Sequence, residues 1–272
     1  MSNLNLETLY YPSADTPKPD LNTENFRIYG HELCPFAQRA FLAFGAKKIT
    51  FQKVHVDLRK KAQWHLDINE GLVPILETPN GDLIPESGFI AQFASDYTDG
   101  KNQGIPLWPH EGKIAGDKTF ALDSAKHRVF IQKFDKLMLS GFYGAYMSHF
   151  SDEEKNKNLV NALNSAEVLF KNQMNGSEWL SQSNNPMYID ICAFTLVERV
   201  AQLKGSIWNQ HYEALKFEEN YPTIAAYVLR FQNHELMKDH IITSKANHAQ
   251  IAMQNLNQPG NKVQLNLEYF DK

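Results

Sequence analysis

Residues 26–41 read Phe26-Arg-Ile-Tyr-Gly-His-Glu-Leu-Cys34-Pro-Phe-Ala-Gln-Arg-Ala-Phe41, which predicts a short strand followed by a helix. The aromatic and β-branched residues before the cysteine favour a strand, and the apolar residues after it recur at helical spacing. Pro35 suits the first helical position because it has no N–H to lose. A thiol at that point faces the free N–H groups and the positive end of the helix dipole, which favour the thiolate. Cys34 is therefore a candidate reactive nucleophile.

The neighbours of Cys34 narrow its chemistry. A redox Cys-X-X-Cys motif would carry its second cysteine at position 37, where this chain has Ala37. A mixed disulfide on Cys34 would therefore need an external thiol to resolve it. The alternative is that Cys34 is a small buried apolar residue, which is how we interpret Cys192 within its apolar segment.

Length and composition exclude several classes of function. The 272 residues suffice for two domains, 43% of them are hydrophobic, and the formal net charge is only −4. This mild charge gives no sign of a nucleic-acid or anionic-membrane partner. Only two cysteines are present, so a disulfide framework is not expected and a reducing compartment fits. Because we find neither a secretory signal nor an apolar run long enough to span a bilayer, we expect a cytoplasmic protein without stable membrane insertion.

The first part of the chain predicts alternating strands and helices. Residues Ile49–Val56 alternate as a strand does, so strand, helix and strand form a βαβ unit whose two strands should be parallel. A short basic helix is followed by a strand that begins at Pro74. Asn80-Gly81 predicts a hairpin to a fourth strand, and Ser87 begins another helix. The order βαβαββα is a thioredoxin-like α/β layout.

The second part of the chain predicts helices only. Residues 113–149 and 152–174 show helical apolar spacing, and 188–197 is too apolar for a surface helix, so it should form the centre of an all-α domain. The predicted boundaries are an extended leader over 1–25, the thioredoxin-like domain over 26–98, a Gly- and Pro-rich linker over 99–110, the all-helical domain over 111–244 and a C-terminal extension over 245–272.

Five motifs, in this order and spacing, carry a resemblance to a known family. They are Phe26-Arg-Ile-Tyr, Cys34-Pro-Phe-Ala-Gln-Arg39, Lys61-Ala-Gln-Trp64, Leu72-Val-Pro74-Ile-Leu-Glu and Pro85-Glu86-Ser87. The chain resembles the cytosolic glutathione transferases of the omega class over nearly all of residues 26–240. The resemblance implies the glutathione transferase fold. In that fold a thioredoxin-like domain binds glutathione, an all-helical domain completes an acceptor pocket, and the protein is usually a homodimer.

The resemblance assigns three residues near the cysteine. Cys34 corresponds to the omega-class catalytic cysteine, which forms a mixed disulfide with glutathione. Phe36 matches a residue that lines the same pocket. Lys61 matches a lysine that meets the glycyl carboxylate of glutathione, which suits a compact point charge. Taken alone, Lys61 could equally be one charge on a solvated face.

Four further residues match the rest of the glutathione site. Val73 matches the residue whose backbone pairs with the cysteinyl part of glutathione, beside Pro74, which the family keeps in cis. Glu86 and Ser87 match the pair that holds the γ-glutamyl end. A helix start offers N–H groups and a hydroxyl to a carboxylate, and a glutamate can face the γ-glutamyl ammonium. Taken alone, Ser87 could be a helix N-cap and no more.

The chain departs from the family pattern at two places. The family commonly has Asn-Pro-x-Gly before the Val-Pro pair, whereas Asn69-Glu-Gly71 is one residue shorter, so this loop could sit differently. The Ser/Thr-x-x-Asp capping box of the helical domain is present as Met187-Tyr-Ile-Asp190, which lacks the hydroxyl.

The resemblance implies a glutathione-dependent thiol transferase and reductase. Glutathione would be its co-substrate, and dehydroascorbate and methylated arsenicals would be plausible electron acceptors. Conjugation to electrophiles should be weak, because Cys34 binds the glutathione sulfur in a disulfide and so does not activate it for conjugation. We expect no metal and no nucleotide, since His31-Glu and His234-Glu each lack the second histidine of a zinc-protease motif and no Gly-rich phosphate loop follows a strand.

The acceptor pocket is predicted between the cysteine and the helical domain. Its candidate residues are aromatic or apolar and lie on two predicted helices, and Tyr227 falls where the family often has an aromatic pocket residue. They are Met138, Phe142, Tyr143, Tyr146, Tyr227 and Phe231. The same spacing would equally suit core aromatics.

Two alternatives to an enzyme share this fold. Chloride intracellular channel proteins have a similar Cys-Pro-Phe-x-x-Arg start and can associate with membranes, but they resemble glutathione transferases least at the corner where Glu86-Ser87 stands. A structural or regulatory descendant that has lost turnover is the other alternative, and the retained Cys34 speaks against it.

Overall fold

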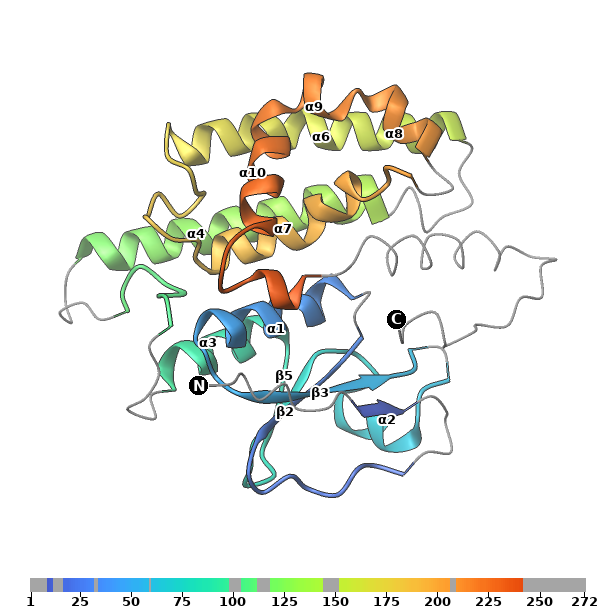
Figure 1. Cartoon of the computed structure of the whole chain (residues 1–272), viewed down its shortest axis with the longest axis vertical. Helices are drawn as coiled ribbons and strands as arrows, with labels where there is room; N and C mark the ends of the chain where they lie inside the picture. Colours follow the sequence, from blue (N-terminus) through green and yellow to red (C-terminus); the bar gives the residue numbers. More distant parts are fainter. Residues whose placement is uncertain are drawn as a thin grey trace. The chain divides into compact units, whose positions relative to one another are not determined.

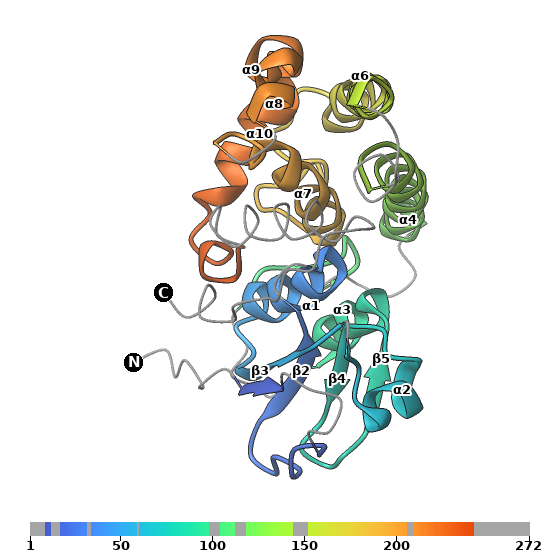
Figure 2. The same cartoon turned by 90° about the vertical axis from the view of Figure 1, so that its right-hand side faces the viewer.

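The chain forms two compact units (Figures 1 and 2). The computed structural model describes residues 9–11, 17–31, 34–58, 60–97, 104–111, 118–143, 152–205 and 209–241. Within these residues, the first unit comprises everything up to 111 together with Glu235–Ile241, and the second comprises 118–234. The first unit is thioredoxin-like and the second is helical, which confirms the predicted fold class.

The first unit is built on a five-stranded sheet in the order β1-β3-β2-β4-β5. Its elements are β1 Leu9–Tyr11, β2 Phe26–Gly30, α1 Pro35–Ala46, β3 Phe51–Val56, α2 Gln63–Asn69, β4 Ile75–Glu77, β5 Leu83–Pro85 and α3 Ser87–Asp96. Strands β2 and β3 are parallel, as the βαβ pattern predicts, and the Asn80-Gly81 turn joins antiparallel β4 and β5. Every predicted strand and helix of this domain is present.

Strand β1 is an element that the sequence did not predict. It lies within the predicted extended leader and pairs parallel with β3, with Leu9 opposite Val54 and Tyr11 opposite Val56. Three residues are too few to show a strand alternation of their own. They form a strand because the edge of β3 offers unpaired backbone groups.

Each face of the sheet packs against its own helices. Phe26 of β2 lies edge-on to Phe44 of α1 and Phe93 of α3, with ring centroids 5.8 and 5.6 Å apart. Both helices lie on that side of the sheet (Figure 2). A Cβ at Gly30 would stand 2.8 Å from the ring of Phe41, so only glycine allows α1 to approach β2 this closely.

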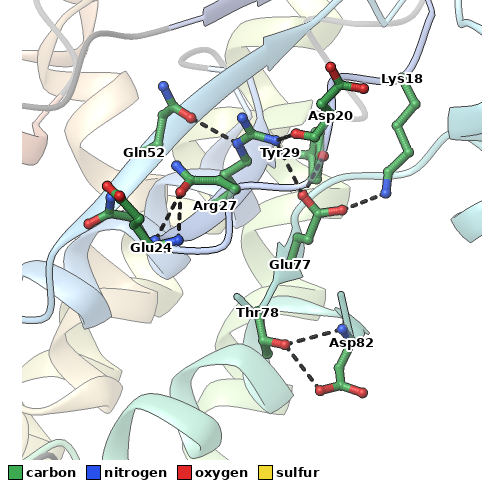
Figure 3. A network of polar contacts seen from close by, with 11 residues as sticks. Lys18, Asp20, Glu24, Arg27, Tyr29, Gln52, Glu77, Thr78 and Asp82 are labelled. Atoms are coloured by element: carbon green, nitrogen blue, oxygen red, sulfur yellow. Dashed lines mark hydrogen bonds and ion pairs between the residues drawn. The ribbon is translucent and has the colours of Figure 1, made fainter. Parts of the chain in front are cut away.

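The opposite face carries a buried carboxylate, Glu77 of β4 (Figure 3). It accepts hydrogen bonds from the Tyr29 hydroxyl at 2.9 Å and from Lys18 Nζ at 2.5 Å, and Arg27 lies 3.6 Å away. Burial, together with the Glu77 charge, raises the pKa of Tyr29. Arg27 also donates to Gln52 Oε1 of β3 at 2.8 Å. Glu77 therefore ties the segment before β2 to the centre of the sheet.

A second carboxylate, that of the partly buried Glu111, changes the interpretation of the predicted linker. Residues 104–111 belong to the first unit, with Leu107 and Trp108 buried. Glu111 accepts the N–H groups of Leu107 at 2.6 Å and Trp108 at 3.0 Å, the hydroxyl of Ser95 at 2.7 Å and Lys47 Nζ at 2.6 Å. Gly104, Pro106 and Pro109, which suggested a linker, are thus part of this turn, and residues 99–103 of the predicted linker lie outside the described residues.

The second unit is organised around one helix, α7. Its elements are α4 Lys118–Met138, the π-helical turn η1 Leu139–Tyr143, α6 Asp152–Met174, α7 Tyr188–Ala201, α8 Asn209–Leu215, α9 Phe217–Asn220 and α10 Pro222–Gln232. Helix α7 is buried from Tyr188 to Val200 and packs against α4 and α10 (Figures 1 and 2). Its burial confirms the prediction made from its apolar sequence.

Asp190 stabilises the start of α7 without the hydroxyl that the capping box lacks. Its carboxylate accepts the N–H of Met187 at 2.9 Å and, from the preceding turn, those of Leu180 at 2.7 Å and Ser181 at 3.3 Å. Complete burial raises the pKa of Asp190 to about 6. The Asp190 N–H, which a capping hydroxyl would accept, donates to the Met187 carbonyl at 3.0 Å, so the helix start is satisfied without the hydroxyl.

The segment Glu235–Ile241 leaves the helical unit and returns to the first one. Its 3₁₀ turn, η2 Lys238–His240, packs on α1, and the His240 ring lies 5.5 Å from that of Phe51. A Cβ at Gly45 of α1 would stand 2.2 Å from His240 Cδ2, so glycine leaves the space that the ring fills. The expected boundary at residue 244 differs from the structure here, because a short turn gives no sign of where it packs.

Burial of His240 predicts a loss of stability in acid. Burial, and secondarily the charge of Lys53, lowers its pKa from 6.5 to about 3, so the unfolded chain takes up a proton that the folded chain does not. Stability should fall as the pH drops below 6.5, by about 2 kcal/mol at roughly pH 5 for this group alone. His240→Phe should therefore make the free energy of unfolding depend less steeply on pH between roughly pH 4 and 6. Urea denaturation at several pH values tests this, and an unchanged slope would contradict it.

Removing the charge of Glu77 should destabilise the first unit. Glu77→Gln leaves the Arg27 and Lys18 cations without their carboxylate, at an expected cost of about 2–3 kcal/mol in unfolding free energy. Asp123→Asn is the matched control, because its ion pair with Lys126 is exposed and should be worth less than about 1 kcal/mol. Equal effects of the two substitutions in urea denaturation would refute the role given to Glu77.

Candidate functional site

The register of the sheet brings the predicted site residues to one edge. Tyr29 of β2 lies opposite Ile75 of β4, which lies opposite Pro85 of β5. Strand β2 ends one residue after these three paired residues, β4 begins with Ile75, and β5 ends with Pro85. The segments with Cys34, with Val73-Pro74 and with Glu86-Ser87 therefore meet at the same edge, where β3 also ends.

Cys34 lies at the N-cap of α1, as predicted. Its N–H donates to the His31 carbonyl at 2.9 Å, and its own carbonyl accepts the first helical hydrogen bond, from Gln38, at 3.0 Å. Pro35 has no N–H, and the N–H groups of the next two residues precede the first helical bond. Such N–H groups and the helix dipole stabilise a negative charge at this end.

Val73 faces the cysteine. The sulfur of Cys34 lies 3.9 Å from the main-chain oxygen of Val73, and the peptide bond between Val73 and Pro74 is cis, as the resemblance implies. Strand β4 begins only at Ile75, so Val73 lies just outside the paired part of the strand. Its main chain is placed to meet an extended ligand beside the thiol.

Two further predicted residues are held by their neighbours. A Cβ built on Gly71 would stand 2.3 Å from Cδ of Lys61, so the lysine stem passes directly over the loop that leads to Val73. The guanidinium of buried Arg39 lies 4.7 Å from the centre of the Phe36 ring, a cation–π contact. Lys61 and Phe36 thus have defined positions next to Val73 and Cys34.

Glu86 and Ser87 form the start of α3. Glu86 is the N-cap and has φ 69°, a conformation that costs a non-glycine residue roughly 1–3 kcal/mol. Its carbonyl nevertheless accepts the N–H of Ile90 at 3.0 Å. Ser87 is the first helical residue and is buried. A strained backbone at a helix start, next to the cysteine edge, is typical of a binding position.

The structure describes four of the six predicted acceptor residues at the level of side chains. Met138 ends α4 and Phe142 lies in η1, and both are buried. The backbone of Tyr143 belongs to η1, but its side chain, like all of Tyr146, lies outside the described residues. The pocket on this side stays a prediction.

Tyr227 and Phe231 belong to the core of the helical unit. The Tyr227 hydroxyl donates to the Asp190 carbonyl at 2.8 Å, and burial with the Asp190 charge raises its pKa. The Phe231 ring stacks on Phe194 at 4.0 Å. Both side chains are fully buried, as Met138 also is, and their contacts within the helical unit favour the core alternative. Their assignment to the acceptor pocket stays a prediction.

Sequence reasoning missed one residue beside the site, His65 of α2. Its ring is buried and its Nε2 lies 3.1 Å from the carbonyl oxygen of Leu72, the residue before Val73. A single histidine in a short helix matches no motif, and the contact depends on how the following loop folds. No sequence signal would have identified it.

The described residues contain no group of three or more His, Cys, Asp or Glu side chains that could hold a metal ion. Among the same residues, no helix is long and apolar enough to cross a membrane.

Comparisons with known proteins agree with the geometry. The family model of the glutathione S-transferase N-terminal domain matches residues 33–96, which span Cys34 to α3. Glutathione S-transferase omega-1 of Sus scrofa is 37% identical over 99 residues, which cover 36% of this chain and 40% of that protein. The chain therefore spans less than half of that relative in this match.

Longer matches extend over both units. Glutathione transferase omega-1 of Caenorhabditis elegans is 25% identical over 237 residues, or 85% of this chain and 86% of that protein. The solved structure of glutathione transferase Omega 3C from Trametes versicolor superposes with a TM-score of 0.63 and 20% identity, over 90% of this chain and 95% of that one. The structural match supports the shared fold.

Gly71 should be required at the site as well as in the turn. It has φ +68°, and a β-carbon there would displace Lys61, whereas Gly176 has φ +84° with nothing within 4 Å of its Cβ position. Gly71→Ala and Gly176→Ala should each cost about 1–2 kcal/mol of stability. Only Gly71→Ala should also weaken glutathione binding measured by calorimetry. Unchanged binding by the Gly71 variant would contradict the position given to Lys61.

Proposed function

We propose that this chain is an omega-class glutathione transferase, which acts as a glutathione-dependent thiol transferase and reductase; its similarity to the N-terminal family domain and to the omega-class relatives supports the proposal. The observation that carries the proposal is the position of Cys34, at the start of α1 and 3.9 Å from the Val73 carbonyl. The only other cysteine, Cys192, is buried in α7 of the other unit. The second thiol of the reaction must therefore come from outside the chain.

The proposed cycle has two exchange steps. The Cys34 thiolate attacks the glutathionyl sulfur of a mixed disulfide, forms a Cys34–glutathione disulfide and releases the substrate as a thiolate, which takes up a proton. The thiolate of a second glutathione then attacks the glutathionyl sulfur, releasing Cys34 and oxidised glutathione. The substrate disulfide is reduced and glutathione supplies the electrons. The helix start that stabilises the thiolate also makes Cys34 a good leaving group.

The site supplies partners for each part of glutathione. The main chain of Val73 would pair with the cysteinyl residue, which places the glutathione sulfur beside Cys34. Lys61 would meet the glycyl carboxylate, and Glu86 with Ser87 would hold the γ-glutamyl end at the start of α3. Phe36, packed on Arg39, would form the wall behind the thiol.

The acceptor and the assembly follow from the resemblance. Dehydroascorbate and methylated arsenicals are the proposed small acceptors besides glutathionyl disulfides, and Met138, Phe142, Tyr143 and Tyr146 are the proposed wall of their pocket. A homodimer and a cytoplasmic location belong to the same proposal.

Substitution of Cys34 tests the mechanism. Cys34→Ala should lower glutathione-dependent reduction of a mixed disulfide by at least about a hundredfold, because the nucleophile is lost. The same variant should conjugate glutathione to an aromatic halide faster than the wild type, because bound glutathione is no longer diverted into a disulfide. Cys192→Ala serves as the control and should leave reduction unchanged. Reduction that survives in Cys34→Ala would refute the mechanism, and an unchanged conjugation rate would count against the diversion of glutathione.

A further inference from the structure

The loop between α2 and β4 is fixed by groups that converge on one carbonyl, that of Leu72. His65 Nε2 lies 3.1 Å from its oxygen, and Asn69 Nδ2 donates to it at 3.3 Å. A carbonyl oxygen only accepts, so the proton of the neutral His65 ring is on Nε2. The Leu72 side chain is 52% exposed and does not anchor the loop.

Backbone hydrogen bonds return this short loop to α2. After the helix ends at Asn69, Glu70 and Gly71 both have positive φ, 52° and 68°. The Gly71 N–H donates to the His65 carbonyl at 3.1 Å, and the Leu72 N–H donates to the Asn69 carbonyl at 2.7 Å. Backbone hydrogen bonds to α2 therefore hold this loop, which is one residue shorter than the family pattern. The side chains of His65 and Asn69 contact its Leu72 carbonyl.

The Leu72 carbonyl and the Val73 N–H are two ends of one peptide group. That group is trans, since the cis bond at this point joins Val73 to Pro74. In a planar trans peptide the C=O and N–H point in opposite directions, so fixing one fixes the other. A hydrogen bond from α2 to the Leu72 oxygen thus turns the Val73 N–H away from α2.

The His65 ring is suited to hold this orientation permanently. It is 1% exposed, its ring centre lies 5.6 Å from that of Trp64, and its Nδ1 has no hydrogen-bond partner among the described residues. Burial lowers the pKa of His65. The hydrogen bond to the Leu72 carbonyl has the opposite but smaller effect. The ring therefore stays neutral near pH 7 and keeps its Nε2 proton on the Leu72 oxygen.

We propose that His65 is a positioning residue for glutathione, which by donating to the Leu72 carbonyl aims the Val73 N–H at the cysteinyl part of the ligand. The proposal rests on the function proposed above and extends it to a residue that does not touch the ligand. A residue that only orients a binding group contributes equally to the ground state and the transition state, so its loss should raise KM and leave kcat unchanged.

Two substitutions separate hydrogen bonding from packing. His65→Phe keeps a ring of similar size but has no donor, and His65→Gln keeps a donor that can reach the same oxygen. We expect His65→Phe to raise the KM for a glutathionyl mixed disulfide, whose glutathionyl part pairs with Val73, about tenfold with kcat within about twofold of the wild type, the loss of roughly one good hydrogen bond. His65→Gln should restore KM to within about threefold of the wild type.

The control is a second buried histidine, His127 of α4, whose Nδ1 likewise has no hydrogen-bond partner in the described part of the chain. His127→Phe should leave the KM for the glutathionyl mixed disulfide unchanged. An unchanged KM in a folded His65→Phe protein, equal KM values for the Phe and Gln variants, or a loss confined to kcat would each overturn the proposal. Circular dichroism establishes whether each variant folds. If His65→Phe does not fold, the His65→Gln variant decides: a KM more than about tenfold above that of the wild type would overturn the proposal.

Binding measurements separate this proposal from the proposed function. A wild type with no glutathione-dependent turnover would refute the function, whereas turnover with an unaltered KM in His65→Phe would refute the role of His65 alone. Calorimetric titration of glutathione into Cys34→Ala, with and without His65→Phe, measures positioning without any turnover. An affinity lowered about tenfold by the second substitution supports the proposal, and equal affinities contradict it.

Discussion

The register of β2 against β4 is the constraint on which the site depends. It places Cys34 and Val73, 39 positions apart in the chain, on neighbouring segments with 3.9 Å between the sulfur and the carbonyl oxygen. A slip of the pairing by one residue would move every side chain of the slipped strand to the opposite face of the sheet. The packing of Phe26 and Tyr29 on opposite faces therefore fixes the register. The core of the first unit and the geometry of its site are therefore set together.

Buried or partly buried carboxylates hold distant parts of each unit in place. Glu77 ties the residues before β2 to the sheet, and Glu111 ties residues 104–111 to α1 and α3. In the second unit, Glu167 of α6 accepts the first N–H groups of α10, and Asp190 collects those before α7. Each of them satisfies several donors at once, which is the condition under which a buried charge stabilises a fold.

The sequence predicted what local signals determine. Cys34-Pro35 at a helix start, the Asn80-Gly81 hairpin and the parallel first pair each follow from residues close together in the chain. Strand β1 and the return of Glu235–Ile241 were not predicted, because both depend on a partner far away in the sequence. The role of Tyr227 could not be read from the sequence, because a core aromatic and a pocket aromatic have the same helical spacing. His65 went unnoticed because its importance lies in a loop conformation that only the structure reveals.

If Cys34 carries glutathione through a mixed disulfide, intact-protein mass spectrometry should detect this intermediate. After incubation with oxidised glutathione, the wild type should gain the mass of one glutathionyl group, and reduced glutathione should remove it. The Cys34→Ala variant should gain none. A wild type without an adduct, or an adduct that persists in Cys34→Ala, would contradict the account.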